Sequence, residues 1–396
     1  MATAAEGTQL SFYIHIPYCV KRCGYCDFNT YTPAELKIES SLNVISRSYI
    51  DLAIKEVEMA RHFYTAKSDP SVPTVPTVTS IFFGGGTPSL MDPVDLGRII
   101  DRIRLLFGLA DGCEITLEAN PDSLTRERLL EYRKVGVNRL SMGMQSAVPH
   151  VLTALDRTHN PNNVGRAVNW AKEIGFQETS LDLIYGTPGE SMDDWRKTVE
   201  SAIALETTHI SAYALIVEEG TKLAAQVKRG EQIMPDEDET ADKYLLADQL
   251  FSAAGLHWYE LSNWSKPGSH SRHNMAYWLG KNWWGVGPGA HSHIDGRRWW
   301  NVKHPNSYRE RIEAGESPML GEEILTSSQI AEEKIMLLSR IPGGILRSDL
   351  SDAQERVIAR YIESEDVDGR AWIEGGLTLT PKGRLIADRI VRELLL

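Results

Sequence analysis

The chain has 396 residues, 42% of them hydrophobic and 24% charged, which is enough for roughly two or three domains with cores of their own. Its formal net charge of −12 argues against a broad nucleic-acid-binding surface, which requires clustered lysine and arginine, so no nucleic-acid partner is expected. The sequence lacks a secretory signal and any apolar run near the ~20 residues of a membrane span, and it has only four cysteines, so we expect a cytoplasmic protein with reduced thiols.

Strand-like runs alternate with helical patterns along the first 230 residues. The predicted strands cover 11–17, 79–85, 114–120, 139–145, 179–186 and 209–217. The helical patterns that follow them cover 46–64, 92–108, 125–136, 160–175, 191–205 and 238–255. Six βα units in series require parallel strands covered by helices. The pattern predicts an α/β fold, either an open barrel or a doubly wound sheet.

Polar and glycine-rich segments follow five of the six predicted strands: "PYCVKRC", "GGGTPS", "EANP", "MQS" and "YGTPG". The carboxyl ends of parallel strands meet at one edge, and that edge binds ligands, so we expect one shared site there. Glu118, Gln145 and Asp182 end successive strands, as groups that fix a ribose or an amino group would. Each of them alone could also be a helix cap.

Three of the four cysteines, Cys19, Cys23 and Cys26, follow the first predicted strand, while Cys113 is distant in sequence. A disulfide is disfavoured by the odd number and the reducing compartment, and a thioredoxin-like pair would leave Cys19 without a role. A structural zinc site would need a fourth ligand, for which His15 is poorly placed. An iron–sulfur cubane on three thiolates, with one iron open to a non-protein ligand, accounts for all three.

The rest of the chain differs in composition from the βα units. Seven of the ten tryptophans and six of the eleven histidines fall between residues 255 and 304. The chain closes with a short strand, a turn and an amphipathic helix that resemble a winged-helix module. We therefore divide it into a tail (1–10), a βα region (11–230), a helix with the aromatic segment (231–304) and a winged-helix-like module (305–396).

The spacing CxxxCxxC resembles the motif of the radical S-adenosylmethionine (SAM) superfamily. That resemblance implies a partial (β/α)6 TIM-like barrel and a [4Fe–4S] cluster held by Cys19, Cys23 and Cys26, whose open iron binds SAM. "FFGGGTPSLM", "EANPDSLT", "RLSMGMQS", "LDLIYGTPGES" and "SRHNMAYW" are similar to the coproporphyrinogen dehydrogenase (HemN) family, and most similar to its HemW-type haem chaperones. By that pattern the SAM site is lined by Tyr13, Gly85, Gly86, Thr87, Glu118, Gln145, Arg157, Asp182 and Ala214.

Two departures favour the chaperones over the oxygen-independent coproporphyrinogen III oxidases, which remain the alternative. The oxidases carry a fourth cysteine where this chain has Phe28, and a long segment before the motif where this chain has eighteen residues. "HNMAYW" matches the HNxxYW motif associated with haem binding, which implies His273, Asn274, Tyr277 and Trp278 as haem residues, with a structural histidine as the competing interpretation.

The resemblance also implies partners. These are haem, a haem-acceptor protein such as a membrane respiratory cytochrome, and an electron donor such as flavodoxin or ferredoxin. A cytoplasmic location that includes the membrane periphery fits such an acceptor. Oxidase activity on coproporphyrinogen is not expected.

Overall fold

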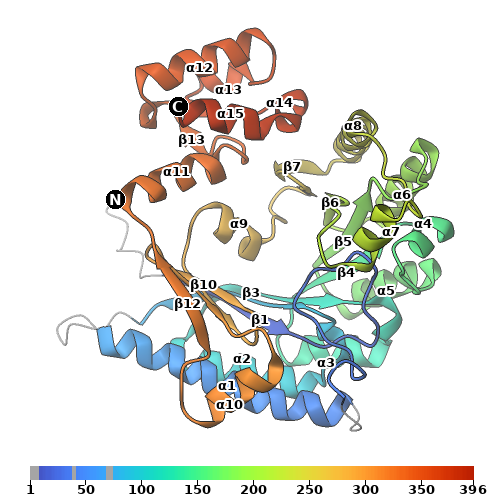
Figure 1. Ribbon diagram of the computed structural model, residues 1–396, viewed down its shortest axis with the longest axis vertical. Helices are drawn as coiled ribbons and strands as arrows, with labels where there is room; N and C mark the ends of the chain where they lie inside the picture. The colour runs from blue at the N-terminus through green and yellow to red at the C-terminus, as the bar shows by residue number, and fades with distance from the viewer. Residues whose placement is uncertain (1–8, 38–41, 68–74) are drawn as a thin grey trace.

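The computed structural model describes residues 9–37, 42–67 and 75–396, so most of the predicted tail and of the loop before residue 75 lies outside the described residues. Six parallel strands lie side by side in chain order (Figure 1): β1 (Gln9–Ile16), β2 (Thr77–Gly85), β3 (Leu109–Ala119), β4 (Arg139–Gln145), β5 (Glu178–Tyr185) and β6 (His209–Ala214). Every crossover advances in the same direction, whereas a doubly wound sheet reverses its strand order. The partial barrel is therefore confirmed.

Helices follow the strands much as predicted. They are α1 (Leu42–Lys67), α2 (Pro93–Phe107), α3 (Arg126–Lys134), α5 (Pro161–Ile174), α6 (Met192–Ala204) and α8 (Glu237–Ala253). Side-chain caps fix several starts: Asp92 accepts from Val94 N, and Ser191 forms a capping box with Asp194. Short elements were not predicted: α4 (Pro149–Ala154), α7 (Lys222–Lys228) and 3₁₀ turns at Pro88–Leu90, Pro121–Ser123 and Arg347–Asp349.

The aromatic segment extends the sheet at both edges. One edge gains β9 (Trp283–Val286), which pairs parallel with β1, and then the antiparallel β10 (His291–Ile294), β11 (Arg297–Asn301) and β12 (Met319–Ile324). The other edge gains β8 (Asn263–Ser265) and β7 (His257–Glu260). Helix α9 (Arg272–Trp278) packs against β2, and α10 (Pro305–Glu313) packs against α1. The result is one sheet of twelve strands.

The C-terminal residues form a second, smaller core above the barrel in Figure 1. Its elements are α11 (Ser327–Leu338), β13 (Ile345–Leu346), α12 (Asp352–Glu363), α13 (Gly369–Ile373), β14 (Gly376–Leu377), α14 (Pro381–Leu385) and α15 (Ala387–Leu394). The final helix is two helices that meet at Ile386, and a buried ion pair between Arg384 and Asp248 (2.7 Å) ties this core to α8. The winged-helix-like character and the domain boundaries remain predictions.

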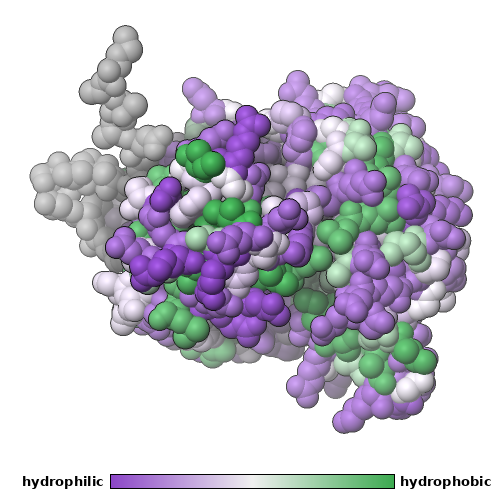
Figure 2. All heavy atoms as spheres, turned by 90° about the horizontal axis from the view of Figure 1, so that it is seen from above, coloured by the Kyte–Doolittle hydropathy of each residue, from purple (hydrophilic) through white to green (hydrophobic). Residues whose placement is uncertain are grey.

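No helix within the described residues is long and apolar enough to cross a membrane. The face of the molecule seen in Figure 2 is hydrophilic over most of its area, and its hydrophobic groups form separate small patches.

A buried carboxyl joins α1 to the added strands. Glu56 is 1% exposed and accepts hydrogen bonds from Tyr308 Oη (2.6 Å), Gly287 N (2.7 Å) and Asn301 Nδ2 (2.7 Å). All three donors are neutral, so burial dominates and raises the pKa of Glu56 to about 7. The carboxyl therefore connects α1, α10, β11 and the loop after β9.

We predict that Glu56 makes the stability of the protein pH-dependent. Its folded-state pKa lies above its ordinary value, so the stability that it contributes is greatest at low pH and is lost as pH rises from about 4.5 to about 7. The loss is on the order of 3 kcal/mol. Glu56→Gln should flatten this segment of the curve when the free energy of unfolding is measured by urea titration from pH 5 to 8. An unchanged slope would contradict the assignment.

Candidate functional site

The cysteine loop, residues 17–31, follows β1 and is closed at its base. Tyr31 N donates to the Pro17 carbonyl (2.7 Å), and Cys19 N donates to the Tyr31 carbonyl (3.0 Å). Inside the loop Cys26 N donates to the Cys23 carbonyl (3.3 Å). These bonds place the three cysteines on one short closed segment at the carboxyl end of β1.

All three cysteines are free thiols that line one cavity. Thr87 Oγ1 lies 3.6 Å from Cys19 Sγ, and an Arg157 Nη atom lies 3.5 Å from Cys23 Sγ. Burial raises the pKa of Cys19, and it raises that of Cys26 to about 11. Because a metal binds the thiolate, loading this site displaces protons and compensates for the buried negative charge.

Cys113 is separate from this group. It lies on β3 with its Sγ 3.9 Å from the Glu114 carbonyl, and burial raises its pKa to about 12. Residues at the opposite, carboxyl end of β3 line the cavity. The structure thus brings together the three predicted cysteines and leaves the fourth outside.

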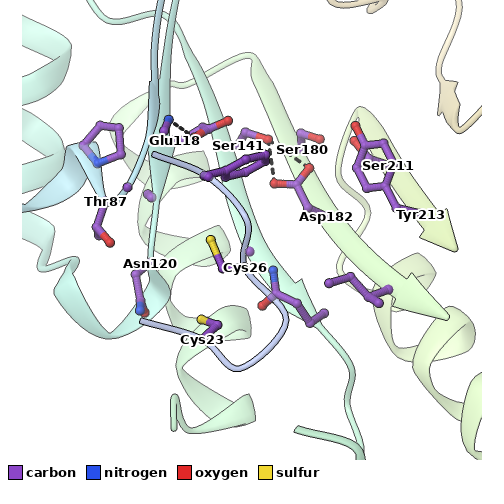
Figure 3. Close-up of a pocket in the computed structure, with 18 of the residues that line it drawn as sticks. Cys23, Cys26, Thr87, Glu118, Asn120, Ser141, Ser180, Asp182, Ser211 and Tyr213 are labelled. Carbon is purple, nitrogen blue, oxygen red and sulfur yellow. Dashed lines mark hydrogen bonds between the residues drawn. The ribbon is translucent and has the colours of Figure 1, made fainter. Parts of the chain in front are cut away.

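The cavity has a volume of about 830 Å³ and lies at the carboxyl ends of the parallel strands. Figure 3 shows Cys23 and Cys26 on their loop below Glu118 and Asp182, which reach in from β3 and β5. Every residue predicted for SAM lines it: Tyr13, Gly85, Gly86, Thr87, Glu118, Gln145, Arg157, Asp182 and Ala214. Polar residues from five strands and the cysteine loop therefore share one space.

Two carboxyl groups dominate the electrostatics of the cavity. Glu118 accepts a hydrogen bond from Gly85 N (3.0 Å), and burial together with the nearby Asp182 raises its pKa to about 8. Asp182 accepts from Ser141 Oγ (2.9 Å), and burial also raises its pKa. Carboxyl groups in this state are poised to bind cations, because a positive ligand restores the ionised form.

Gly85 and Gly86 line the cavity and also allow two backbone segments to pack closely together. A Cβ on Gly85 would lie 2.5 Å from the His15 ring, and φ there is +107°. A Cβ on Gly86 would lie 2.5 Å from the Tyr18 carbonyl. The glycines thus allow β2 to approach the end of β1 and the cysteine loop.

Further polar residues of the cavity were missed from the sequence. Ser141, Ser180, Ser211, Asn120 and Tyr213 line it, and Figure 3 shows them beside the predicted residues. A signal was present, because each of three successive strands carries a serine that lies on the same face as the other polar residues of the cavity. Among the described side chains, Gln145 Oε1 and Arg157 Nε are buried without a hydrogen-bond partner.

Three of the four predicted haem residues, His273, Asn274 and Tyr277, line the same cavity from α9. His273 is 1% exposed; its Nδ1 lies 2.8 Å from Ser80 Oγ, and its Nε2 lies 2.8 Å from the Tyr277 hydroxyl. Both ring nitrogens are therefore occupied in this structure. Haem ligation by His273 stays a prediction, and it would require the ring to release one of these two partners, because an iron binds a single imidazole nitrogen.

Comparison with known proteins agrees with the fold and shows that the chain is a radical SAM protein. The description "Radical SAM superfamily" matches residues 13–202. "Heme chaperone HemW" of Mycobacterium tuberculosis is 45% identical over 98% of this chain and 95% of its own length, and that of Bacillus subtilis is 31% identical over 96% and 97%. This chain therefore belongs to the HemW family within the radical SAM superfamily. The fold of coproporphyrinogen III oxidase (HemN) from Escherichia coli is similar, with a TM-score of 0.79 at 21% identity over 98% of this chain and 90% of that one.

The cofactors of that superfamily, a [4Fe–4S] cluster and SAM, fit the residues present. Three free thiols line the cavity, and unpaired polar atoms of Gln145 and Arg157 and two carboxyl groups of raised pKa also belong to its lining. The ammonium group and the sulfonium charge of SAM suit the two carboxyl groups and Gln145 Oε1, and its carboxylate and ribose oxygens suit the N–H of Arg157.

We predict that cluster content depends on the cysteine loop and not on Cys113. Cys23→Ala removes one of three thiolates, so iron and acid-labile sulfide in anaerobically purified protein should fall several-fold. Cys113→Ser changes a buried thiol outside the cavity and should leave both contents as in the wild type. Loss of the cluster in Cys113→Ser would contradict the three-thiolate site.

Proposed function

We propose that this protein is a haem chaperone, which binds haem and delivers it to an acceptor protein. The observation that carries this proposal is its 45% identity over 98% of the chain to the haem chaperone of M. tuberculosis. Further relatives of the same name in B. subtilis, Synechocystis and E. coli support it. Similarity that spans both the barrel and the C-terminal core is what retention of the whole function requires.

The proposed radical SAM centre is held by the cavity residues. Cys19, Cys23 and Cys26 ligate the cluster, and Glu118, Asp182 and Gln145 hold the polar groups of SAM. With both bound, this centre would supply one-electron reductive chemistry at the sulfonium group of SAM. The chain's own contribution is to orient SAM, to supply the charge of Arg157 next to Cys23, and to exclude water with Tyr13 and Tyr25.

The alternative function is oxidation of coproporphyrinogen III, and the similar fold of the E. coli oxidase is its support. Phe28 weighs against it. It stands where the oxidase motif has its fourth cysteine, and it is 60% exposed at the mouth of the cavity. An exposed phenyl ring there cannot replace a thiol as a ligand or as a donor of hydrogen.

We propose two protein partners, a haem acceptor such as a membrane respiratory cytochrome and a reductant such as flavodoxin or ferredoxin. Lys21 and Arg22 are exposed on the cysteine loop, at the mouth of the cavity. Their charge suits an acidic electron carrier that must approach the cluster closely. An acceptor in a membrane would bring the chaperone to the membrane periphery.

We predict that SAM binds more tightly as pH rises through 8. Below that pH the Glu118 carboxyl is protonated in the ligand-free site, and the positive charge of SAM favours its ionised form, so binding must release a proton. Between pH 8.5 and pH 7 the Kd should weaken by up to about tenfold in anaerobic calorimetry.

Glu118→Gln should flatten this dependence. Asp27→Asn changes an exposed carboxylate at the same cavity and serves as its matched control, which should keep the wild-type dependence. A wild-type Kd that stays constant over this pH range would contradict the role of Glu118.

We also predict that the anaerobically purified protein binds added haem with a distinct Soret band and leaves coproporphyrinogen III unchanged. The check is an absorption titration with haem, followed by chromatographic analysis of porphyrins after incubation with SAM and dithionite. Formation of protoporphyrinogen IX with SAM consumed in step would make the oxidase assignment correct.

A further inference from the structure

A face of imidazole and indole rings lies on the added strands. On β10, Ser292 and Ile294 are buried toward the main core, so the alternate residues His291 and His293 lie on the opposite face. The register pairs His291 with Trp300 on β11 and His293 with Trp283 on β9. We name these four residues, Trp283, His291, His293 and Trp300, the imidazole–indole face.

The rings of this face form two pairs. His291 and Trp300 are stacked, with ring centroids 6.0 Å apart and planes at 28°, and Trp283 and His293 lie 4.9 Å apart at 36°. Trp300 also lies over Gly321 of β12, where a Cβ would be 2.7 Å from its ring. A side chain at Gly321 would displace the indole, so the glycine allows the Trp300 ring to lie directly against β12.

One histidine of this face has free ring nitrogens. His291 is exposed, and within the described part of the chain no hydrogen bond reaches either of its ring nitrogens. Its partner on the strand, His293, is engaged at both nitrogens, by the Lys281 carbonyl (3.3 Å) and by Gly296 N (3.3 Å). Partial burial and the charge of Lys303 lower the pKa of His291, which keeps its ring neutral and able to donate a lone pair at neutral pH.

The charged residues around the imidazole–indole face suit a ligand that is planar, amphipathic and anionic. Lys303 is exposed and close enough to His291 to act on its pKa, so a cation stands beside the available imidazole. Arg298 lies on the same side of β11 as Trp300 and forms an ion pair with Glu333 of α11, which brings that helix to the border of the face. Haem combines an iron that takes imidazole, a flat apolar ring and two carboxylates.

We propose, on the basis of the proposed haem-chaperone function, that haem binds on the imidazole–indole face with His291 as its iron ligand and the edge of Trp300, whose plane lies 28° from that of His291, against the macrocycle. Lys303 pairs with a haem propionate. The site is open to solvent on one side, as transfer to an acceptor requires. His273 keeps a structural role, in which it fastens α9 to β2 through Ser80 and completes the wall of the SAM cavity.

A further consequence is that haem and SAM occupy separate sites. The cavity is lined by the cysteines, the two carboxyl groups and His273, whereas neither His291 nor Trp300 is among its residues in the described structure. Saturation with SAM should therefore leave the affinity for haem unchanged. Displacement of haem by SAM would place haem in the cavity and overturn the proposal.

The test is haem titration of the full-length, cluster-loaded protein, read by the Soret band and by electron paramagnetic resonance of the ferric iron. His291→Ala should weaken haem binding at least tenfold and remove the spectrum of an imidazole-ligated iron. Added free imidazole should restore that spectrum in the variant. Iron–sulfur absorbance and SAM affinity should stay at wild-type values, which shows that the variant is folded.

Two control variants separate the competing ligands. His270→Ala removes another exposed imidazole, one that is stacked on Tyr259 and has no indole beside it among the described ring contacts, and it should bind haem as the wild type does. His273→Ala should retain the Soret band of the wild type. Loss of that band in His273→Ala with retention in His291→Ala would overturn the proposal.

Haem binding by the wild type distinguishes failure of the proposed site from failure of the proposed function. If it binds haem and His291→Ala gives an identical titration and spectrum, the site is wrong while the chaperone function stands. If the wild type binds no haem, the proposed function itself fails, and the site fails with it.

Discussion

The closure of the cysteine loop is the constraint on which the rest of the site depends. The Tyr31 N–H donates to the Pro17 carbonyl and the Cys19 N–H donates to the Tyr31 carbonyl, so the loop leaves β1 at residue 17 and returns to it at residue 31. Asn29 then fastens it from the side, with Nδ2 donating to the carbonyls of Pro288 (2.9 Å) and Lys303 (2.8 Å). Three thiols can bind one cluster only if their loop holds them close together. The bonds at the base of the loop and those of Asn29 therefore preorganise the cluster site.

The site also buries two ionisable carboxyl groups. Glu118 and Asp182 are desolvated near each other with hydrogen bonds from Gly85 and Ser141, and neither forms an ion pair with another described residue. A fold that only required stability would replace such groups with apolar ones. Two carboxyl groups buried in a cavity indicate a ligand whose positive charge pairs with them. Binding of that ligand offsets the desolvation cost of burying the carboxyl groups.

Local patterns predicted the parallel α/β units and the ligand-binding edge of the sheet, because the alternation of strands and helices and the residues at strand ends are visible in short stretches of sequence. They left open whether the sheet is a barrel or doubly wound. The six βα units and the strand-end residues Glu118, Gln145 and Asp182 were found in this way, whereas Tyr13, Arg157 and Ala214 were implied only by the resemblance to the family. Pairings between distant segments were not: nothing near Trp283 in the sequence indicates that β9 joins β1. The environment of His273 was hidden for the same reason, since Ser80, its partner, lies 193 positions away.

The position of β9 has a consequence for the making of the protein. The first strand pairs on one side with β9, and the cysteine loop is fastened by a bond between Asn29 and Pro288, which are 259 positions apart. During synthesis the cysteines leave the ribosome early, yet their loop gains its last supports only after most of the chain has emerged. Contacts of such long sequence separation form slowly. The structure that holds the three cysteines in place is therefore complete only when β9 and the loop after it have folded.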